Sequence, residues 1–460
     1  MMKNNLEIDY YHIAETKLKE IEQKGNMIKA AEIYIDLNRY MNIEIEENAI
    51  KNSEVGTKNG MSVRIFDKRG SLGFSYTNRF EKFALDMMIK NAFKMMNAGT
   101  PDPDFKDLPS HYDNYPNVKA LYNENIENFK IEEASRYVAD LIEVCDEDKL
   151  AISQSATFKT NYSETYVFNS NGVETTGKKT IASISSNIIV KDDSTGETSS
   201  GFERQSVRDL RELNGKDTAS LALEDAKQNL NRKKIKNLKV PVILTPKGTS
   251  SLILGPLASA INAETFQYKR SFLVGKRGKK IGSSMLTVED NALIDGATGS
   301  STFDDEGVPC KNKMIVEEGN FLKNGLLHNS YTASKEGITS TGNAVRSSYS
   351  STPSISSTNF ILKTGELSKD EMIRDIKKGI LFDYTGDSPN IATGDFSGLI
   401  LHGNLIQNGE ISHSLNETMF GINLMDLFKN ISAISKDYKV YGSFWAPYVK
   451  IEDMQIIGSA

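Results

Sequence analysis

The side chains best suited to chemistry gather in residues 302–360. Asp304, Asp305 and Glu306 follow one another and are closed by a glycine, a valine and a proline, and Arg346 lies later in the same segment. A guanidinium can hold a carboxylate through two hydrogen bonds, so Arg346 is a candidate partner for these acids. We expect the four side chains to face a cavity, where they order loops or hold a ligand. Ordinary hairpin loops with turn-forming acids and a solvated arginine would explain the same composition.

Two further polar residues qualify as site candidates. Asn343 lies in the stretch TGNAVR that ends at Arg346, and Asp395 lies in the glycine-flanked turn GDFSG, residues 394–398. An aspartate in such a turn either forms the turn or faces a ligand. The three consecutive acids do not predict a cation site by themselves, because residues that follow one another along a strand point to opposite faces.

The histidines and cysteines give no local metal motif. The histidines are His12, His111, His328, His402 and His413. No two are spaced to share one helix face, and no CxxC occurs, so a zinc motif of the common kinds is absent. Whether His328, His402, His413 and Cys310 converge in the fold stays open. The sequence also lacks the GxSxG elbow of serine hydrolases and the lysine motif of phosphate-binding loops.

Composition indicates a globular protein of a reducing compartment. The chain has 460 residues, enough for two or more domains and a sizeable core. Its net charge of −6 disfavours a nucleic-acid partner, which would need concentrated positive charge. Cys145 and Cys310 give no disulfide framework. The N-terminus shows no apolar signal segment, and no run approaches the ~20 apolar residues of a membrane helix, so we expect a cytoplasmic protein without a membrane partner.

Periodicity predicts both strands and helices in the N-terminal half. Alternating apolar residues over 29–75 predict a meander of strands, with a turn at Asn59-Gly60. Apolar residues at three- and four-residue spacing predict amphipathic helices over 80–96 and 131–145. The methionines of the first helix and Cys145 in the second are expected in the core. Four prolines in residues 101–116 predict a linker or a long excursion rather than an element.

Further along the chain, strands and turns dominate. Residues 151–202 predict more strands, and residues 217–231 predict a helix. A second helix is predicted over 250–266. Asn-Gly pairs between short apolar runs predict hairpins at Asn324-Gly325 and Asn408-Gly409, because both central residues of a type I′ turn need a positive φ.

These elements predict an α+β fold with two domains. A mixed α/β domain would occupy residues 1–238 and include the proline-rich excursion near residues 100–116. A largely antiparallel, barrel-like β domain would occupy residues 239–460. An apolar strand that begins near residue 239 marks the boundary.

Several motifs resemble those of the TldD/PmbA family, historically called modulators of DNA gyrase. The matching motifs are TFDDEGV (302–308), GLL (325–327), TGNAVR (341–346), TGDFS (393–397) and NGE (408–410), with GMSVR (60–64) and NSNG (169–172) in the N-terminal half. They keep the family order and cover most of the chain. Members of this family look like two-lobed proteins that dimerise around an internal cavity.

The resemblance implies a branch without its own zinc site. In the TldD branch, an HExxxH helix and a downstream cysteine hold the metal. The corresponding helix here is GPLASAINAE, residues 255–264, and contains no histidine. After NGE this chain has ISH, residues 411–413, where the metal-binding branch has its cysteine. The chain therefore resembles the PmbA/TldE branch, and no catalytic residue of the family can be carried over.

The resemblance also implies a function. We expect a component of a TldD/TldE-type metallopeptidase for peptide processing, which shapes the cavity while zinc is held by a TldD-like partner. An extended or unfolded peptide would be the substrate, and adding a strand to a sheet edge is a common way to grip it. A stand-alone homodimeric module that binds peptide or protein without cleaving it is the alternative. Direct gyrase or DNA binding is disfavoured by the acidic charge. The candidates for peptide binding or loop ordering are Asp304, Asp305, Glu306, Asn343, Arg346 and Asp395.

Overall fold

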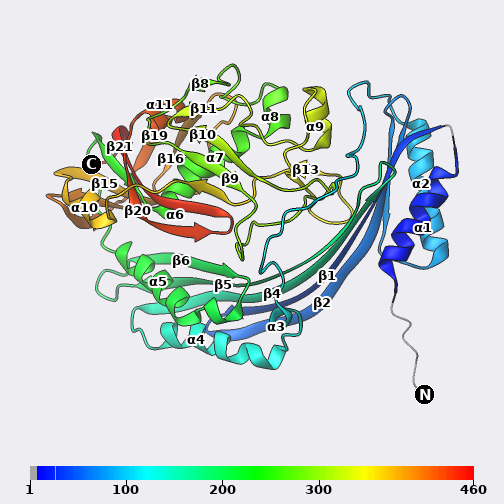
Figure 1. Cartoon of the computed structure of the whole chain (residues 1–460). Helices are drawn as coiled ribbons and strands as arrows, with labels where there is room; N and C mark the ends of the chain where they lie inside the picture. Colours follow the sequence, from blue (N-terminus) through cyan, green and yellow to red (C-terminus); the bar gives the residue numbers. More distant parts are fainter. Residues whose placement is uncertain (1–7, 26) are drawn as a thin grey trace.

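The computed structural model describes residues 8–25 and 27–460. A six-stranded antiparallel sheet with the order β3-β2-β1-β4-β5-β6 forms the N-terminal half. Its strands are β1 (Ile28–Glu46), β2 (Ala49–Asp67), β3 (Leu72–Thr77), β4 (Ala151–Asn169), β5 (Glu174–Lys191) and β6 (Thr198–Val207). The long strands curve along one side of the C-terminal half (Figure 1).

Helices cover one face of this sheet. They are α1 (Tyr10–Glu22), α2 (Lys82–Ala98), α3 (Glu124–Glu127), α4 (Ser135–Asp146) and α5 (Gly215–Gln228), with short 3₁₀ turns η1 (Ile131–Ala134) and η2 (Leu210–Glu212). The apolar residues of β1 fall at odd positions, with Ile35 in the core against α1 and α2 and Ile43 in the core against α4 and α5. The predicted helices and the buried Cys145 are confirmed.

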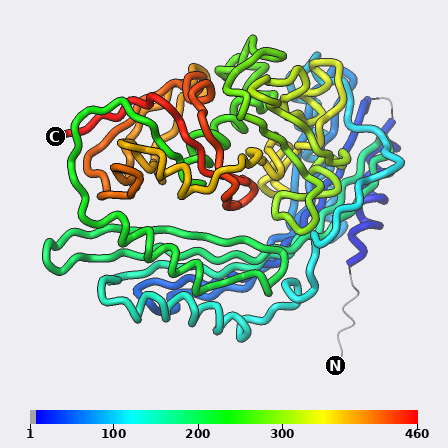
Figure 2. Tube along the Cα trace, turned by 60° about the vertical axis from the view of Figure 1, so that its left-hand side comes forward, coloured from blue at the N-terminus to red at the C-terminus, as the bar shows by residue number. Residues whose placement is uncertain are grey.

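The other face of β1 is polar and lies toward the C-terminal half. Successive side chains of a strand alternate between faces, so Glu32, Tyr34, Asp36, Asn38 and Tyr40 share this side. The view of Figure 2 shows the C-terminal half on one side of the sheet and the N-terminal helix at its end. The sequence therefore places a row of hydrogen-bonding groups between the two halves.

A branched sheet of 13 strands forms the C-terminal half. Its path is β18-β17-β15-β7-β21-β14-β9-β10-β11-β8, and β16, β19 and β20 branch from it. The strands are β7 (Leu238–Leu244), β8 (Lys279–Lys280), β9 (Val288–Asn291), β10 (Asn312–Glu317), β11 (Asn320–Phe321), β14 (Phe360–Leu362), β15 (Lys378–Tyr384), β16 (Asp395–Leu399), β17 (His402–Gln407), β18 (Glu410–Ser414), β19 (Met419–Asn423), β20 (Ile431–Tyr441) and β21 (Phe444–Ile457). Most pairs are antiparallel, although β14 runs parallel to β21 and β15 runs parallel to β7.

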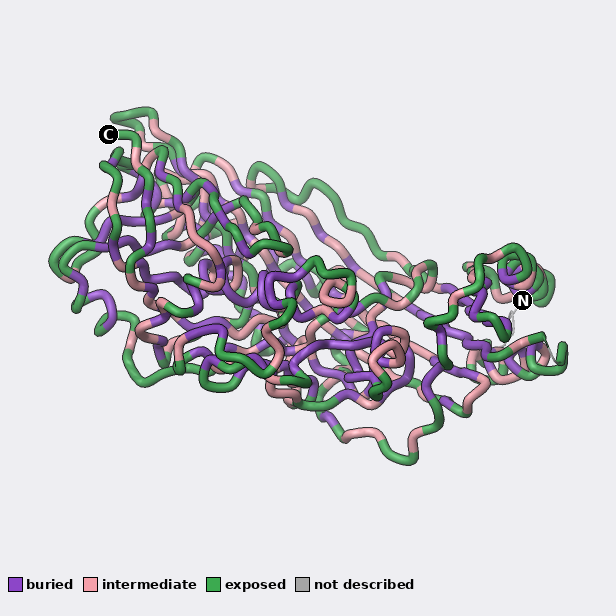
Figure 3. The backbone as a smooth tube through the Cα atoms, turned by 90° about the horizontal axis from the view of Figure 1, so that it is seen from above, coloured by how far each residue is buried: buried purple, intermediate pink, exposed green. Residues whose placement is uncertain are grey.

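Short helices and one small ladder complete the C-terminal half. They are α6 (Pro246–Thr249), the π-helical turn η3 (Ser250–Leu254), α7 (Gly255–Ala260), α8 (Ala263–Gln267), α9 (Ser330–Lys335), α10 (Lys369–Arg374), α11 (Leu424–Lys429) and the pair β12 (Ala344–Val345) and β13 (Ser354–Ile355). Buried positions run through both halves in Figure 3. The predicted α+β class is confirmed. No helix in the described part of the chain is long and apolar enough to cross a bilayer.

Two predicted Asn-Gly turns were wrong. Gly60 lies inside β2, where a Cβ atom would lie 2.5 Å from the ring of Tyr349, and the hairpin instead turns at Glu47 and Asn48. Gly325 lies beyond β11, and the hairpin between β10 and β11 turns at Glu318 and Gly319, whose φ values are 46° and 78°. At both positions neighbouring atoms lie too close for a Cβ atom, which explains why the residue is a glycine. The hairpin at Asn408-Gly409 is confirmed.

The predicted helix over 250–266 is broken into segments. It starts at Pro246 in α6, continues through the π-helical turn η3, and ends as α7 at Ala260. Asn262 then starts α8 by accepting hydrogen bonds from the backbone N–H groups of Glu264 and Thr265. An Asn that caps a new helix competes with the continuation of the old one, which accounts for the break.

The proline-rich segment is a packed excursion. Phe105 stacks on Phe66 of β2, with ring centroids 3.7 Å apart. The Tyr115 hydroxyl donates to the Gly307 carbonyl at 2.9 Å, and the His111 backbone N–H donates to the Asn171 carbonyl at 3.0 Å. The segment thus connects the end of the N-terminal sheet to the 302–360 stretch.

Candidate functional site

Asp304 closes the tight loop at the start of the 302–360 stretch. Its carboxylate accepts backbone N–H groups from Glu306 at 2.9 Å, Val308 at 3.0 Å and Ala344 at 2.9 Å. Gly307 supplies the turn with a φ of 75°. Burial, followed by the charge of Glu306, raises the pKa of Asp304 to about 8 despite these donors. The side chain is buried and directed at backbone groups of its own loop and of Ala344.

Asp305 and Arg346 are joined by two hydrogen bonds, each between a backbone group of one residue and the side chain of the other. The Arg346 backbone N–H donates to Asp305 Oδ2 at 2.6 Å, and Arg346 Nε donates to the Asp305 carbonyl at 3.3 Å. The tip of the guanidinium reaches Glu32 on β1 instead. The expected two-point contact between Arg346 and one of the three acids is therefore absent from the described contacts, and Glu32 takes that place.

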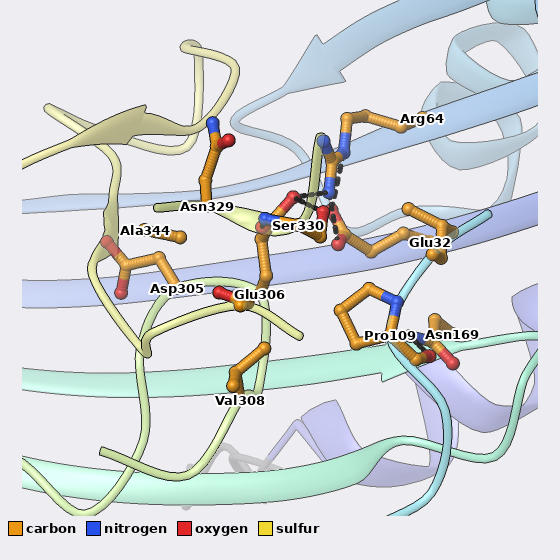
Figure 4. A network of polar contacts seen from close by, with 12 residues as sticks. Glu32, Arg64, Pro109, Asn169, Asp305, Glu306, Val308, Asn329, Ser330 and Ala344 are labelled. Carbon is orange, nitrogen blue, oxygen red and sulfur yellow. Dashed lines mark hydrogen bonds and ion pairs between the residues drawn. The ribbon is translucent and has the colours of Figure 1, made fainter. Parts of the chain in front are cut away.

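Four buried side chains form an ion cluster between the two halves, which we call the Glu32 cluster: Glu32, Arg64, Glu306 and Arg346. Arg64 donates to both oxygens of Glu32 at 2.9 and 2.6 Å, and to Glu306 at 2.9 Å (Figure 4). Ser330 adds its backbone N–H and hydroxyl to Glu306 at 2.8 and 2.7 Å. Two acids and two guanidiniums balance, so the cluster joins β1 and β2 to the C-terminal loops without excess charge.

The opposite charges of the Glu32 cluster shift the pKa values of its members toward the charged forms. Burial alone would disfavour a carboxylate, but the nearby charges of Arg346 and Arg64 outweigh it and lower the pKa of Glu32. Burial also opposes ionisation of Arg64, and the two carboxylates reverse that effect and raise its pKa. The charged forms of Glu32 and Arg64 are therefore favoured by their partners in the cluster.

Asn343 lies next to this neighbourhood, whereas Asp395 lies elsewhere. Asn343 is buried; its amide donates to Asp290 at 2.9 Å and accepts from Lys313 at 2.9 Å. Asp395 is an exposed residue at the start of β16 and accepts from Asn423 of β19 at 2.9 Å. The structure thus gathers five of the six candidates around the 302–346 loops and separates Asp395 from them.

Sequence reasoning missed a pocket of about 990 Å³ between the N-terminal sheet and the C-terminal half, which we call the Asp225 pocket. Its apolar and aromatic lining includes Ile189, Phe202, Tyr384, Leu401, Tyr441 and Phe444. Its ionisable lining includes Asp225 of α5, Lys247 of α6, Asp383 of β15 and His402 of β17. Because these residues come from four elements on both halves of the chain, no local spacing could have revealed them.

The charged groups of this pocket contact one another. Lys247 Nζ lies 2.8 Å from Asp225 Oδ2 and 3.7 Å from Asp383 Oδ2, and His402 Nδ1 lies 3.5 Å from Asp225 Oδ1. Burial opposes ionisation of Asp225, but the hydrogen bond with His402 and the charge of Lys247 lower its pKa to about 2. Burial raises the pKa of Asp383, whose Oδ2 has no hydrogen-bond partner among the described residues. A ligand in the pocket would therefore meet Asp225 already paired with Lys247 and one carboxyl oxygen of Asp383 without a hydrogen-bond donor among the described residues.

The pocket does not fit a metal ion as it stands. Asp225, Asp383 and His402 place ligand atoms within 4.8 Å of one another. The ammonium of Lys247, however, already contacts both carboxylates and supplies the positive charge that a metal would bring. A cation would have to displace this lysine first.

Of the four residues left open by the sequence, His402 belongs to this group, whereas His328, His413 and Cys310 do not. Within residues 8–25 and 27–460, His328, His413 and Cys310 belong to no cluster of potential metal ligands. Burial lowers the pKa of His328 to about 4 and raises that of Cys310 to about 12. The Cys310 thiol donates to the Gly342 carbonyl, with the sulfur 3.4 Å from the oxygen, which suits a structural thiol.

The π-helical turn η3, which leads into the helical segment singled out by the sequence, borders the Asp225 pocket. Ser250 and Ser251 of η3 line the pocket, and a Cβ atom on Gly255, the first residue of α7, would lie 3.9 Å from the ring of Phe444 in the same lining. Pro256 and Ala260 are buried against the core. Hence α7 presents no imidazole, carboxylate or thiol where it approaches the pocket.

Comparison with known proteins defines the class. Three domain models of one metallopeptidase family match in order: PmbA/TldA metallopeptidase domain 1 over residues 31–96, the central domain over 124–230 and the C-terminal domain over 237–458. The first two regions share the single six-stranded sheet described above. The fold is thus that of a PmbA/TldA-type metallopeptidase. The chain belongs to the TldD/PmbA family.

Individual relatives cover nearly the whole chain. Metalloprotease MJ0996 of Methanocaldococcus jannaschii is 27% identical over 435 residues, which are 92% of this chain and 93% of the relative. The metalloprotease PmbA homolog of Buchnera aphidicola is 24% identical over 470 residues, 99% of each chain. The crystal structure of TldE from Thermococcus kodakarensis superposes with a TM-score of 0.86 at 23% identity, covering 97% of this chain and all of that one, and shows the same fold.

Proposed function

We propose that this chain is the PmbA/TldE-type subunit of a cytoplasmic TldD/TldE-type metallopeptidase that processes extended or unfolded peptides. The observation that carries the proposal is the composition of α7 beside the Asp225 pocket. The family resemblance makes α7 part of the helix in which the metal-binding branch has its zinc motif, and here that helix contains Gly255, Pro256 and Ala260. The likeness to a TldE structure and to relatives named metalloproteases supports the same assignment.

The chemistry of zinc peptidases explains why a partner is needed. Such an enzyme uses the metal to lower the pKa of a bound water and a carboxylate to take its proton. Nothing on α7 can ligate a metal, and Lys247 fills the space between the nearest acids. The zinc and the base therefore come from a TldD-like partner, and this chain contributes walls of the shared substrate cavity.

The 302–346 loops have an ordering role in this proposal. The charges of the Glu32 cluster and the carboxylate of Asp304 are engaged with groups of the chain itself. Asn343 is likewise engaged on both sides of its amide. Asp395 is the candidate that leaves its carboxylate exposed, and it keeps a role in peptide contact.

Reconstitution with a TldD-like chain tests the proposal. We expect peptide cleavage only from the mixture, close to zero zinc in this chain alone, and complete loss of cleavage when the glutamate of the partner's HExxxH motif is replaced. The matched control carries Arg211→Ala in this chain, a surface substitution that should leave zinc content and cleavage unchanged. One zinc per isolated chain, or cleavage by this chain alone, would contradict the proposal. A stable self-dimer that binds peptide and never pairs with the partner would favour the stand-alone binding module.

A further inference from the structure

The two acids of the Asp225 pocket differ in how many hydrogen bonds the chain supplies to them. Asp225 accepts from the Lys247 ammonium at 2.8 Å and from the Asn229 amide at 3.0 Å. Asp383 accepts through Oδ1 from the Thr245 hydroxyl at 2.5 Å, and its Oδ2 has no donor among the described residues. Because a buried oxygen without a donor is unfavourable, Asp383 keeps one oxygen for a ligand, whereas Asp225 belongs to the scaffold.

Lys247 has donors to spare beside this oxygen. Its ammonium carries three N–H groups and makes one hydrogen bond within the described part of the chain, to Asp225. Its Nζ lies 3.7 Å from Oδ2 of Asp383, which is too far for a hydrogen bond. The pocket therefore presents an unused donor and an unused acceptor next to each other.

A neutral carboxamide matches this pair of groups. Its carbonyl oxygen accepts and its NH2 group donates, and the two atoms lie ~2.2 Å apart, since its C=O and C–N bonds are ~1.23 and ~1.33 Å long. Two slightly diverging hydrogen bonds then reach Lys247 and Asp383. A charged head group suits the pair less well, because an ammonium bound to Asp383 lies close to Lys247 and a carboxylate bound to Lys247 lies close to Asp383.

The rest of the pocket offers cover for an apolar body. Phe202 of β6, Tyr384 of β15 and Leu401 line it and are 43%, 44% and 41% exposed. Tyr441 and Phe444 add two further rings. Small-molecule sites combine such walls with a few polar groups that fix the orientation of the ligand, in volumes of about 300–1,000 Å³. The volume of about 990 Å³ lies at the upper end of this range.

We propose that the Asp225 pocket binds a small molecule that bears a primary carboxamide on an aromatic ring. The carboxamide lies between Lys247 and Asp383, where it accepts from the ammonium and donates to the free carboxylate oxygen. The ring lies against Phe202, Tyr384 and Phe444 and covers apolar surface that water otherwise reaches. This binding requires neither zinc nor a partner chain, so it goes beyond the proposed peptidase role.

Two arginines define the competing arrangement, in which the ligand is a carboxylate. Arg232 lines the pocket but pairs with Glu197 at 2.8 Å. Arg204 of β6 is exposed, lines the pocket and forms no ion pair with a described residue, so it offers a carboxylate a different partner. The two arrangements differ in the charge of the head group that binds, and ligands of matched shape separate them.

Phenylacetamide, phenylacetate and phenethylamine place a neutral, an anionic and a cationic head group on the same ring. In ligand-observed NMR titrations of the full chain, we expect the affinity for phenylacetamide to be about tenfold higher than for either charged analogue. Absence of saturable phenylacetamide binding below ~10 mM, or a charged analogue that binds as tightly, would overturn the proposal. N-acetylglutamine methylamide carries the carboxamide as a peptide side chain does, without the ring, and equally tight binding of this compound would overturn the aromatic assignment.

Asp383→Asn is the sharpest variant, because it keeps the shape of the side chain and changes one atom. Thr245 holds the oxygen of the new amide, so the NH2 group replaces Oδ2 and donates into the pocket beside Lys247. We expect this variant to bind phenylacetate more tightly than phenylacetamide, the reverse of the wild-type order, and an unchanged order would contradict the proposal. The matched control is Asp113→Asn, whose side chain is 91% exposed in the proline-rich segment and which should keep the wild-type order.

A wall residue tests the site independently of Asp383. Phe202→Ala changes an exposed side chain and should weaken all three ligands by about threefold or more while keeping their order. Unchanged affinities would overturn the contact between the ring and Phe202. These titrations involve no cleavage and no partner, so their failure is distinct from failure of the reconstitution.

Discussion

Replacing Arg346 by alanine would unbalance the Glu32 cluster. Glu32 and Glu306 would then share the single guanidinium of Arg64, and one buried negative charge would lack compensation. Removing one partner of a buried ion pair destabilises a protein by about 3–5 kcal/mol. The stacking of the guanidinium on the Tyr34 ring, 4.4 Å from its centroid, would also be lost, and is worth about 0.5–2 kcal/mol.

A second substitution separates charge from packing. Glu32→Gln in the Arg346→Ala background leaves Arg64 paired with Glu306, so the buried charge is again zero. The double variant should therefore be destabilised by less than the sum of the single variants, with a coupling of about 1–3 kcal/mol. A purely steric role of Arg346 predicts additive effects instead.

Urea unfolding followed by circular dichroism measures the effect, and limited proteolysis of the 302–346 loops measures local opening. The matched control is Arg211→Ala, because Arg211 pairs with Asp209 at the surface and its loss should leave the unfolding midpoint unchanged. An Arg346→Ala protein as stable as this control would refute the charge argument. Unchanged stability with lower peptide turnover in the reconstituted complex would assign Arg346 to peptide binding.

Three further predictions follow from buried groups. The pKa of Asp304 is raised to about 8 in the folded protein, so its contribution to stability is present at low pH and is lost as the pH rises through 8. The unfolding midpoint of the Asp304→Asn variant should therefore rise relative to that of the wild type as the pH increases from about 5 to about 9. A difference between the two midpoints that does not change with pH would contradict this. Cys145 and Cys310 are buried and should react with a thiol reagent only after unfolding; rapid labelling of the native protein would show otherwise. Gly201→Ala would place a Cβ atom 2.1 Å from a carbonyl oxygen of α5 and should destabilise by about 1–3 kcal/mol, whereas Gly421→Ala, with no atom within 4 Å, should not shift the thermal midpoint.

Local signals in the sequence were sufficient to predict the helices and strands. They were insufficient to predict which residues of other elements these helices and strands contact. Alternation in β1 and helical periodicity in α2 depend on residues within one element, and both were predicted correctly. Asn408-Gly409 turns a hairpin, but Gly60 has the same dipeptide context and is instead a place where the Tyr349 ring approaches. A glycine allows either a positive φ or a close approach, and only the tertiary fold decides which is used.

The candidate site shows the same division. The family motifs drew attention to Asp304 and Arg346, and the fold places both in one neighbourhood, but the ion partner of Arg346 lies on β1, far away in the sequence. The Asp225 pocket was not predictable, because its charged residues stand on four elements of both halves and no two share a local motif. Such a site is defined by sheet register and by packing between the halves, which a single sequence does not display.

Hydrogen-bond satisfaction distinguishes the two buried charge groups. In the Glu32 cluster each carboxylate accepts hydrogen bonds from a guanidinium, and Ser330 donates a further hydrogen bond to Glu306. The carboxylates of this cluster therefore find their hydrogen-bond donors within the chain. In the Asp225 pocket the Lys247 ammonium contacts both acids, yet Asp383 keeps an oxygen without a donor beside open volume. An unsatisfied buried polar atom is unfavourable unless something else compensates it. The first group therefore holds the halves together, and the second is where a ligand would improve on the free protein.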